Sequence, residues 1–283
     1  MQEPPSLTRT RELLARGWTK RRIRAAVQSG RLLRLRAGAY TPAGTHADVV
    51  DAGRLLGRLT GTSELARRGV FVLATDRLEV HVVRSSSRIP PLGRPHRIHR
   101  RVLLRTPHPD ALAVEPIDAL YDAVMGQNPR AAIATLDSAL HLGLLHPDDL
   151  DELFAALPRR FRRLRRLLDA RAESGAESLL RLILRAIGCS VECQVTIPGV
   201  GRVDFLVDGW LIIECDSEAH HASWEAQRND RRRDLAAAKQ GLVTFRVIAE
   251  DVFWHSDDVR EAVSALVKAV PARRLHGRSA RRC

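Results

Sequence analysis

The chain has 283 residues, of which 45% are apolar, and it carries a formal net charge of +13. This length and apolar content allow two folded domains and exclude a disordered chain. The charge favours a polyanionic partner, nucleic acid ahead of an anionic membrane surface, although a GC-rich genome also produces frequent arginine.

The cysteines and the hydropathy predict a reduced, cytoplasmic protein with no membrane partner. The sequence contains no C-x-x-C pair, which argues against a structural zinc site, and four scattered cysteines in a chain of this length do not suggest a disulfide framework. The N-terminus lacks the pattern of a signal peptide. No apolar run approaches the roughly 20 residues that a transmembrane helix needs.

Residues 1–45 predict a basic winged helix-turn-helix. A first helix should stop at Gly17, a second should begin after Thr19, and residues 31–40 alternate as a short hairpin. A small basic subdomain that packs on the rest of the chain is the alternative. The expected DNA contacts lie on the second helix and the hairpin: Lys20, Arg21, Arg22, Arg24, Arg34 and Arg36.

Residues 46–150 predict an α/β scaffold without a catalytic cluster. We expect helices over residues 49–65, 116–124 and 130–142, strands over 71–73 and 78–83, and a loop over 85–96. The histidines of this segment lack the spacing of metal ligands, so we interpret them as solvated or structural.

Two strongly basic segments flank the last predicted domain. Residues 151–172 form a basic helical linker, in which arginines alternate with apolar residues that could pack on an apolar surface. Residues 271–283 form a basic tail that would add nonspecific attraction to polyanions.

Residues 173–270 predict a compact domain with the order α-β-β-β-α-β-α. Ser174 and Glu177 have the spacing of a capping box at the start of its first helix. Three strands over residues 191–197, 202–207 and 210–215 are followed by a polar helix over 224–240, a strand over 242–248 and a last helix over 256–270.

Three acidic residues lie in this strand region, where carboxylates are normally rare. Asp204 precedes a turn at residues 208–209, while Glu214 and Asp216 follow the turn and share one face of their strand. A two-residue turn would put Asp204 and Glu214 on opposite faces. A three-residue, bulged loop with Gly209 in the left-handed conformation would bring them together, and we predict this loop. The three carboxylates would then bind one Mg²⁺ or Mn²⁺ ion.

The order Glu177, Asp204, Glu214 resembles the PD-(D/E)XK nuclease superfamily, whose core is α-β-β-β-α-β. The run from Ile213 to His221, with Arg233 and Arg246 further on, is similar to the group related to the very short patch repair endonuclease. The resemblance implies a metal held by Asp204 and Glu214, with Glu177 in support. It also implies a histidine near the scissile phosphate, His221 ahead of His220, and arginines that brace the site or contact phosphate. Asp216 stands where the superfamily has its lysine.

The N-terminal half has a resemblance of its own. Gly17-Trp-Thr-Lys and the run from Ser29 to Tyr40 are similar to the winged-helix segment of AbiEi-type antitoxins, which are transcriptional repressors. Residues 63–69 and 116–142 are similar to the module that follows that segment.

Together these patterns predict a mixed α/β (α+β) chain that is a magnesium-dependent DNA endonuclease of repair or defence. The catalytic set would be Asp204, Glu214, Asp216, His221 and Glu177, and DNA would contact the N-terminal basic residues together with Arg233 and Arg246. An AbiEi-like regulator with an inactive nuclease fold and a protein that only coats nucleic acid are the alternatives. The substrate stays open among mismatched, modified, single-stranded or foreign DNA and RNA, and cutting both strands would favour a homodimer.

Overall fold

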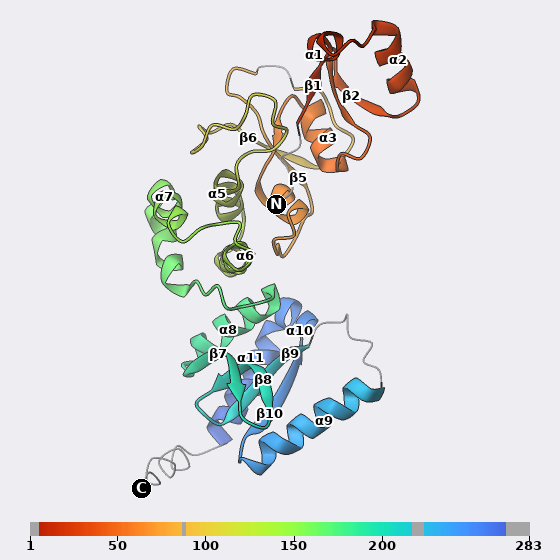
Figure 1. Ribbon diagram of the computed structural model, residues 1–283. Helices are drawn as coiled ribbons and strands as arrows, with labels where there is room; N and C mark the ends of the chain where they lie inside the picture. The colour runs from red at the N-terminus through yellow and green to blue at the C-terminus, as the bar shows by residue number, and fades with distance from the viewer. Residues whose placement is uncertain (1–5, 87–88, 217–223, 270–283) are drawn as a thin grey trace. The chain divides into compact units, whose positions relative to one another are not determined.

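The computed structural model describes residues 6–86, 89–216 and 224–269. The chain divides into two compact units, residues 1–165 and 166–283 (Figure 1). Each unit combines helices with small sheets around buried apolar side chains, so the fold class is mixed α and β. None of the described helices combines the length and the apolar character of a transmembrane span.

The first unit begins with two short helices and a three-stranded antiparallel sheet of order β1-β3-β2. The elements are β1 (Thr8–Arg9), α1 (Thr10–Ala15), α2 (Lys20–Gln28), β2 (Leu32–Arg36) and β3 (Ala39–Pro42). Thr19 caps α2 as predicted, because its hydroxyl accepts a hydrogen bond from the amide of Arg22 at 3.1 Å. The two predicted helices and the hairpin are therefore present, and β1 is an additional strand that the sequence did not predict.

The rest of the first unit surrounds a second small sheet of order β4-β5-β6. Its elements are α3 (Ala47–Arg54), β4 (Arg58–Leu59), α4 (Gly61–Arg67), β5 (Leu78–His81), β6 (His96–His99), α5 (Pro116–Gly126), α6 (Pro129–His141), α7 (Asp149–Ala156) and the 3₁₀ helix η1 (Arg159–Leu167). The predicted helix over 49–65 is wrong because the chain turns at Leu56, with φ of +59°. It then passes so close to β5 that a Cβ on Gly57 would lie 2.3 Å from Val80 Cγ1. The predicted strand over 71–73 is wrong as well, while β6 was not predicted.

A buried polar network joins this sheet to α5. His99 lies between two carboxylates, with Nε2 3.1 Å from Glu79 Oε2 and Nδ1 3.4 Å from Asp122 Oδ1. Thr60 and Arg101 also donate hydrogen bonds to Asp122. The His99 imidazole is therefore held between two acidic side chains in a buried network.

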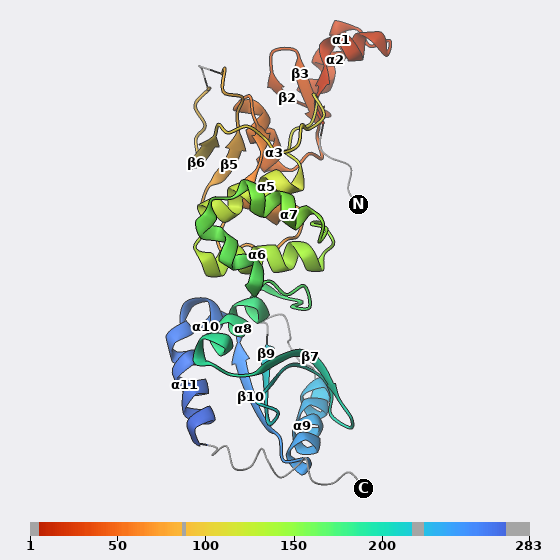
Figure 2. The ribbon, with the colours of Figure 1, turned by 90° about the vertical axis from the view of Figure 1, so that its left-hand side faces the viewer.

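The second unit is built on one four-stranded sheet of order β10-β9-β8-β7. Its elements are α8 (Gly175–Ile187), β7 (Val191–Ile197), β8 (Gly201–Val207), β9 (Leu211–Asp216), α9 (Trp224–Lys239), β10 (Val243–Ile248), α10 (Ala249–Trp254) and α11 (Ser256–Ala269). The pairs β7–β8 and β8–β9 are antiparallel, whereas β9 and β10 are parallel and have α9 between them in the chain. Figures 1 and 2 show α9 on one face of this sheet and α8, α10 and α11 on the other. The predicted order of elements holds, with α10 added before the last helix.

The turn between β8 and β9 fixes how their carboxylates are placed. Val207 pairs with Leu211, so three residues, 208–210, form the loop. Gly209 has φ of +71°, and Asp208 is also left-handed, at +51°. The predicted three-residue loop is therefore confirmed.

Candidate functional site

A row of four polar residues crosses the sheet of the second unit, one from each strand. Arg246 on β10 pairs directly with Glu214 on β9. Continuing the β8–β9 register by one residue places Asp204 opposite Glu214. In the same way, Gln194 on β7 lies opposite Asp204, between the pairs Cys193–Phe205 and Val195–Val203. Directly opposed residues on neighbouring strands point to the same face, so the row gathers these four polar groups.

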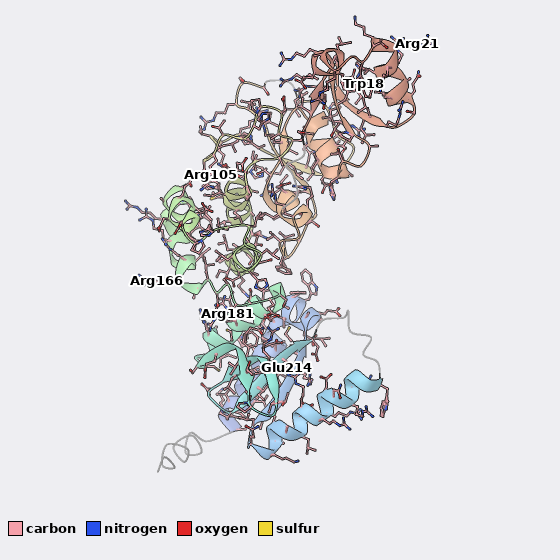
Figure 3. All side chains as sticks on the ribbon, in the orientation of Figure 1. Trp18, Arg21, Arg105, Arg166, Arg181 and Glu214 are labelled. Carbon is pink, nitrogen blue, oxygen red and sulfur yellow. The ribbon has the colours of Figure 1, made fainter. Side chains whose placement is uncertain are left out.

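Glu214 is the most buried member of the row and is held by two arginines. Its side chain is 11% exposed. Arg233 of α9 donates to Oε1 of Glu214, which is labelled in Figure 3, at 2.9 Å, and Arg246 donates to Oε2 at 2.6 Å. Burial raises the pKa of Glu214, and the two arginines oppose that rise while Asp204 and Asp216 add to it. The pKa of Glu214 thus depends on the balance between burial and two anions, which raise it, and two arginines, which lower it.

Asp204 is held by one backbone amide and one side-chain amide. Its Oδ2 accepts from the backbone nitrogen of Cys215 at 2.9 Å, and Oδ1 lies 3.4 Å from Gln194 Nε2. These two bonds fix the carboxylate of Asp204 on the strand next to Glu214. Burial chiefly, with Asp204 and other acidic neighbours, raises the pKa of the Cys215 thiol to about 12.

Glu177 joins the site from the first turn of α8. Its Oε2 accepts from Gln194 Nε2 at 2.8 Å and from the backbone nitrogen of Glu173 at 3.0 Å. Ser174 caps α8 by accepting from the amide of Glu177, but Glu177 bonds back to Glu173 and not to the Ser174 amide, so the predicted capping box is only half formed. Burial raises the pKa of Glu177, and the negative charge of Asp204 acts in the same direction.

Asp216 lies at the exposed end of β9, where Arg246 Nη1 is 3.6 Å from its Oδ1. Arg246 also donates through Nη2 to Asp234 of α9 at 3.0 Å. The guanidinium of Arg246 therefore forms ion pairs with three carboxylates, those of Glu214, Asp216 and Asp234. Asp234 was not among the predicted site residues.

The predicted carboxylates Glu177, Asp204, Glu214 and Asp216 thus come from α8, β8 and β9 of the second unit. Among the described residues, no three histidine, cysteine, aspartate or glutamate side chains are placed to hold a metal ion together. The metal trio of Asp204, Glu214 and Asp216 stays a prediction. His221 and His220 lie outside the described residues.

Gln194 is a second residue of this region, after Asp234, that the sequence analysis missed. Its strand alternates, with apolar residues at 191, 193, 195 and 197, so a polar residue at 194 has the ordinary pattern of a solvent-facing position. Only the register against Asp204 and the contact with Glu177 reveal its role.

The basic N-terminal surface is a second candidate site, in the first unit. Lys20, Arg21, Arg22 and Arg24 are exposed on α2. The guanidinium of Arg22 stacks over the ring of Trp18 at 4.4 Å. Figure 3 labels Trp18 and Arg21 in this part of the first unit. Lys20 and Arg24 also line a hollow of about 320 Å³ with Arg34 and Tyr40. Three of the predicted basic residues, Lys20 and Arg24 of the helix and Arg34 of the hairpin, therefore lie around one hollow.

No protein-family model matches the sequence, and no curated protein is similar enough to be reported as a relative.

Proposed function

We propose that the protein is a divalent-metal-dependent DNA endonuclease whose catalytic site is the carboxylate group around Asp204 and Glu214. The observation that carries the proposal is the polar row, which sets Asp204 opposite Glu214 in the middle of a sheet. Facing carboxylates repel one another, and a bound cation relieves this repulsion. The element order and the positions of Glu177, Asp204 and Glu214 agree with the PD-(D/E)XK resemblance.

The donor set fits a hard cation. Mg²⁺ and Mn²⁺ prefer carboxylate and carbonyl oxygens, and the site offers Asp204, Glu214 and Glu177. Each carboxylate has about four acceptor positions, so the arginine bonds of Glu214 leave acceptor capacity for a metal. A bound metal would polarise a phosphate oxygen and lower the pKa of a bound water.

The chain's own residues have distinct roles in this mechanism. Asp204 and Glu214 would hold the ion, Glu177 would fix Gln194 and the start of α8, and Asp216 would add negative charge at the rim of the site. Arg233 and Arg246 orient Glu214 and supply positive charge beside the position of the phosphate. His221 would accept the proton of the attacking water.

The N-terminal surface supplies the proposed DNA recognition. The order β1-α1-α2-β2-β3, with the sheet β1-β3-β2, agrees with a winged helix-turn-helix in which α2 approaches the DNA. The exposed basic residues of α2, with Arg34 and Arg36 on the hairpin, provide phosphate contacts. A homodimer would suit cleavage of both strands.

One observation favours a second function, an AbiEi-like DNA-binding regulator with an inactive nuclease fold. Both oxygens of Glu214 are bonded to arginines, so the charge that a metal would neutralise is already compensated. In this alternative DNA binding is sequence-specific and independent of metal.

The deciding experiment is cleavage of supercoiled plasmid and of labelled single strands with Mg²⁺, Mn²⁺ or EDTA. Wild type should cut only with metal. The Asp204→Ala variant should cut at least about 100-fold more slowly than wild type. Asp257→Ala, which removes an exposed carboxylate of α11, is the matched control and should cut normally. Cutting by Asp204→Ala at the wild-type rate would contradict the proposal, and metal-independent binding without cutting would favour the regulator.

A further inference from the structure

The 3₁₀ helix η1 has a sequence that repeats every three residues, which is also the period of the helix. Its nine residues read Arg-Arg-Phe, Arg-Arg-Leu, Arg-Arg-Leu. A 3₁₀ helix has three residues per turn, so side chains three positions apart lie directly above one another. The apolar residues therefore form one column, in which Phe161 and Leu164 are buried. The six arginines form the other two columns, and all of them are exposed.

The acidic residues of the preceding helix, α7, are paired with other arginines. Asp151 pairs with Arg165 near the end of η1, while Asp149 and Glu152 pair with Arg105. Four arginines of η1 form no ion pair with any residue that the structure describes. These four, called the η1 arginines below, are Arg159, Arg160, Arg162 and Arg163. Their like charges repel one another unless an anion lies beside them.

The η1 arginines are held in a fixed arrangement by the helix that carries them. Dense runs of like charge usually belong to disordered tails, whereas this run is attached to the first unit by its buried apolar column. Successive arginines of one column lie about 6 Å apart along the helix axis. A guanidinium donates two parallel hydrogen bonds to a phosphate, so such a row suits a ligand with regularly repeated phosphates.

A nucleic-acid duplex fits these arginines better than a membrane or a single strand does. Amphipathic segments bind membranes through apolar side chains that enter the bilayer, and the apolar column of η1 faces the protein. Single strands are held by bases that stack on exposed aromatic rings. Phe161 is buried, and the guanidinium of Arg160 lies over its ring at 4.7 Å. The charges of η1 therefore suit the phosphate backbone of a duplex.

We propose that the η1 arginines form a second nucleic-acid-binding surface, which contacts the phosphate backbone of duplex DNA whatever its sequence. This inference rests on the DNA partner of the proposed function, and it requires neither the metal site nor cleavage. It adds a contact outside the winged helix, on the segment that leads into the second unit.

Fluorescence anisotropy of the full chain with a labelled duplex of random sequence tests the inference, in EDTA and at several salt concentrations. Arg162→Gln/Arg163→Gln removes one charge from each arginine column and leaves the buried apolar column in place. Arg162→Lys/Arg163→Lys keeps both charges. The matched control is Arg54→Gln/Arg260→Gln, which also removes two exposed charges, each paired with an aspartate on its own helix. Thermal unfolding of each variant reports whether the fold is kept.

The measured quantity is the slope of log affinity against log salt concentration, to which each duplex phosphate contact contributes about 0.9. Arg162→Gln/Arg163→Gln should therefore reduce the magnitude of the slope by about 1.8 and weaken binding at low salt. The lysine variant and the control should each change the slope by less than about 0.5, because the contacts with phosphate are kept.

A wild-type slope in the glutamine variant, or an equal loss in the control, would overturn the inference and leave the proposed function standing. A loss confined to labelled single strands would overturn it too, as would a loss confined to vesicles of phosphatidylserine and phosphatidylcholine. If the glutamine variant has the reduced slope but wild type does not cut DNA, the inference stands and the endonuclease proposal fails. If wild type does not bind duplex DNA, both fail.

Discussion

Arg246 and Glu214 occupy paired positions on the parallel strands β10 and β9, with Arg246 Nη1 2.6 Å from Glu214 Oε2. Arg246 also reaches Asp234 of α9, so one guanidinium ties both strands to the helix that precedes β10 in the chain. A largely buried carboxylate that loses such a partner is costly to keep ionised. The pair therefore links the stability of the second unit to the charge of its candidate site.

Arg246→Ala should lower the free energy of unfolding by about 2 kcal/mol, because Glu214 would keep only Arg233 as a charged partner. Urea denaturation of the full chain at neutral pH measures this change. Arg260→Ala is the control, since Arg260 forms an exposed i,i+3 pair with Asp257 and should cost less than about 0.5 kcal/mol. Equal losses in the two variants would show that the pair with Glu214 is of no consequence for stability.

His99 gives the first unit a predicted loss of stability at alkaline pH. Burial lowers the pKa of its imidazole, but the hydrogen bonds and charges of Asp122 and Glu79 outweigh this effect and raise the pKa from 6.5 to about 9. Because the folded-state pKa lies above the unfolded one, the stabilisation is complete below pH 6.5 and is lost as the pH rises through 9. A difference of this size corresponds to about 3 kcal/mol.

Urea unfolding between pH 6 and 10 checks this dependence. His99→Gln should be less stable than wild type at pH 6, and the gap should close by pH 10. The matched control is His255→Gln, which changes an exposed histidine paired with Asp251 and should follow the wild-type curve. A gap between wild type and His99→Gln that stays constant with pH would contradict the assignment of the charge to His99.

In the second unit the observed helices and strands agree closely with the predicted ones, because local sequence patterns specify them. The strands alternate in hydrophobicity, Gly209 marks the turn, and Ser174 caps the first helix, so the sequence predicted these elements within a few residues. The structure of the first unit differs from the prediction at positions where tertiary contacts override the local sequence pattern. Residues 55–60 have a helical pattern, yet packing of Gly57 against Val80 turns the chain into β4.

The residues of the candidate site differ in the same way: some follow from local sequence signals, and others depend on tertiary contacts. Asp204 and Glu214 could be predicted because carboxylates are rare in strands and the turn fixes their parity. Gln194 and Asp234 could not, because a glutamine in an alternating strand and an aspartate in a charged helix are ordinary at those positions. Their roles depend on strand register and on where α9 packs, and both are long-range properties of the fold.

Gly209→Ala tests the loop that brings Asp204 and Glu214 together. Gly209 has φ of +71°, and an added Cβ would meet no atom within 4 Å, so the cost should come from backbone strain alone. We expect a loss of about 1 kcal/mol in urea denaturation. Gly44→Ala is the control, because Gly44 has equal space without a positive φ and should change stability little. A loss in Gly44→Ala as large as that in Gly209→Ala would remove the conformational explanation.

The basic surface of α2 predicts a specific salt dependence of DNA binding. Each phosphate contact to duplex DNA contributes about 0.9 to the slope of log affinity against log salt concentration. Arg21→Ala and Arg24→Ala should therefore each reduce the magnitude of this slope by about 0.9 and weaken binding at low salt, whatever the DNA sequence. Fluorescence anisotropy with a labelled duplex at several salt concentrations measures the slope. Arg54→Ala is the control, because Arg54 pairs with Asp51 on α3 and should leave the slope unchanged. If the α2 variants keep the wild-type slope, the phosphate contacts lie elsewhere, and the α2 surface is a packing face rather than the DNA interface.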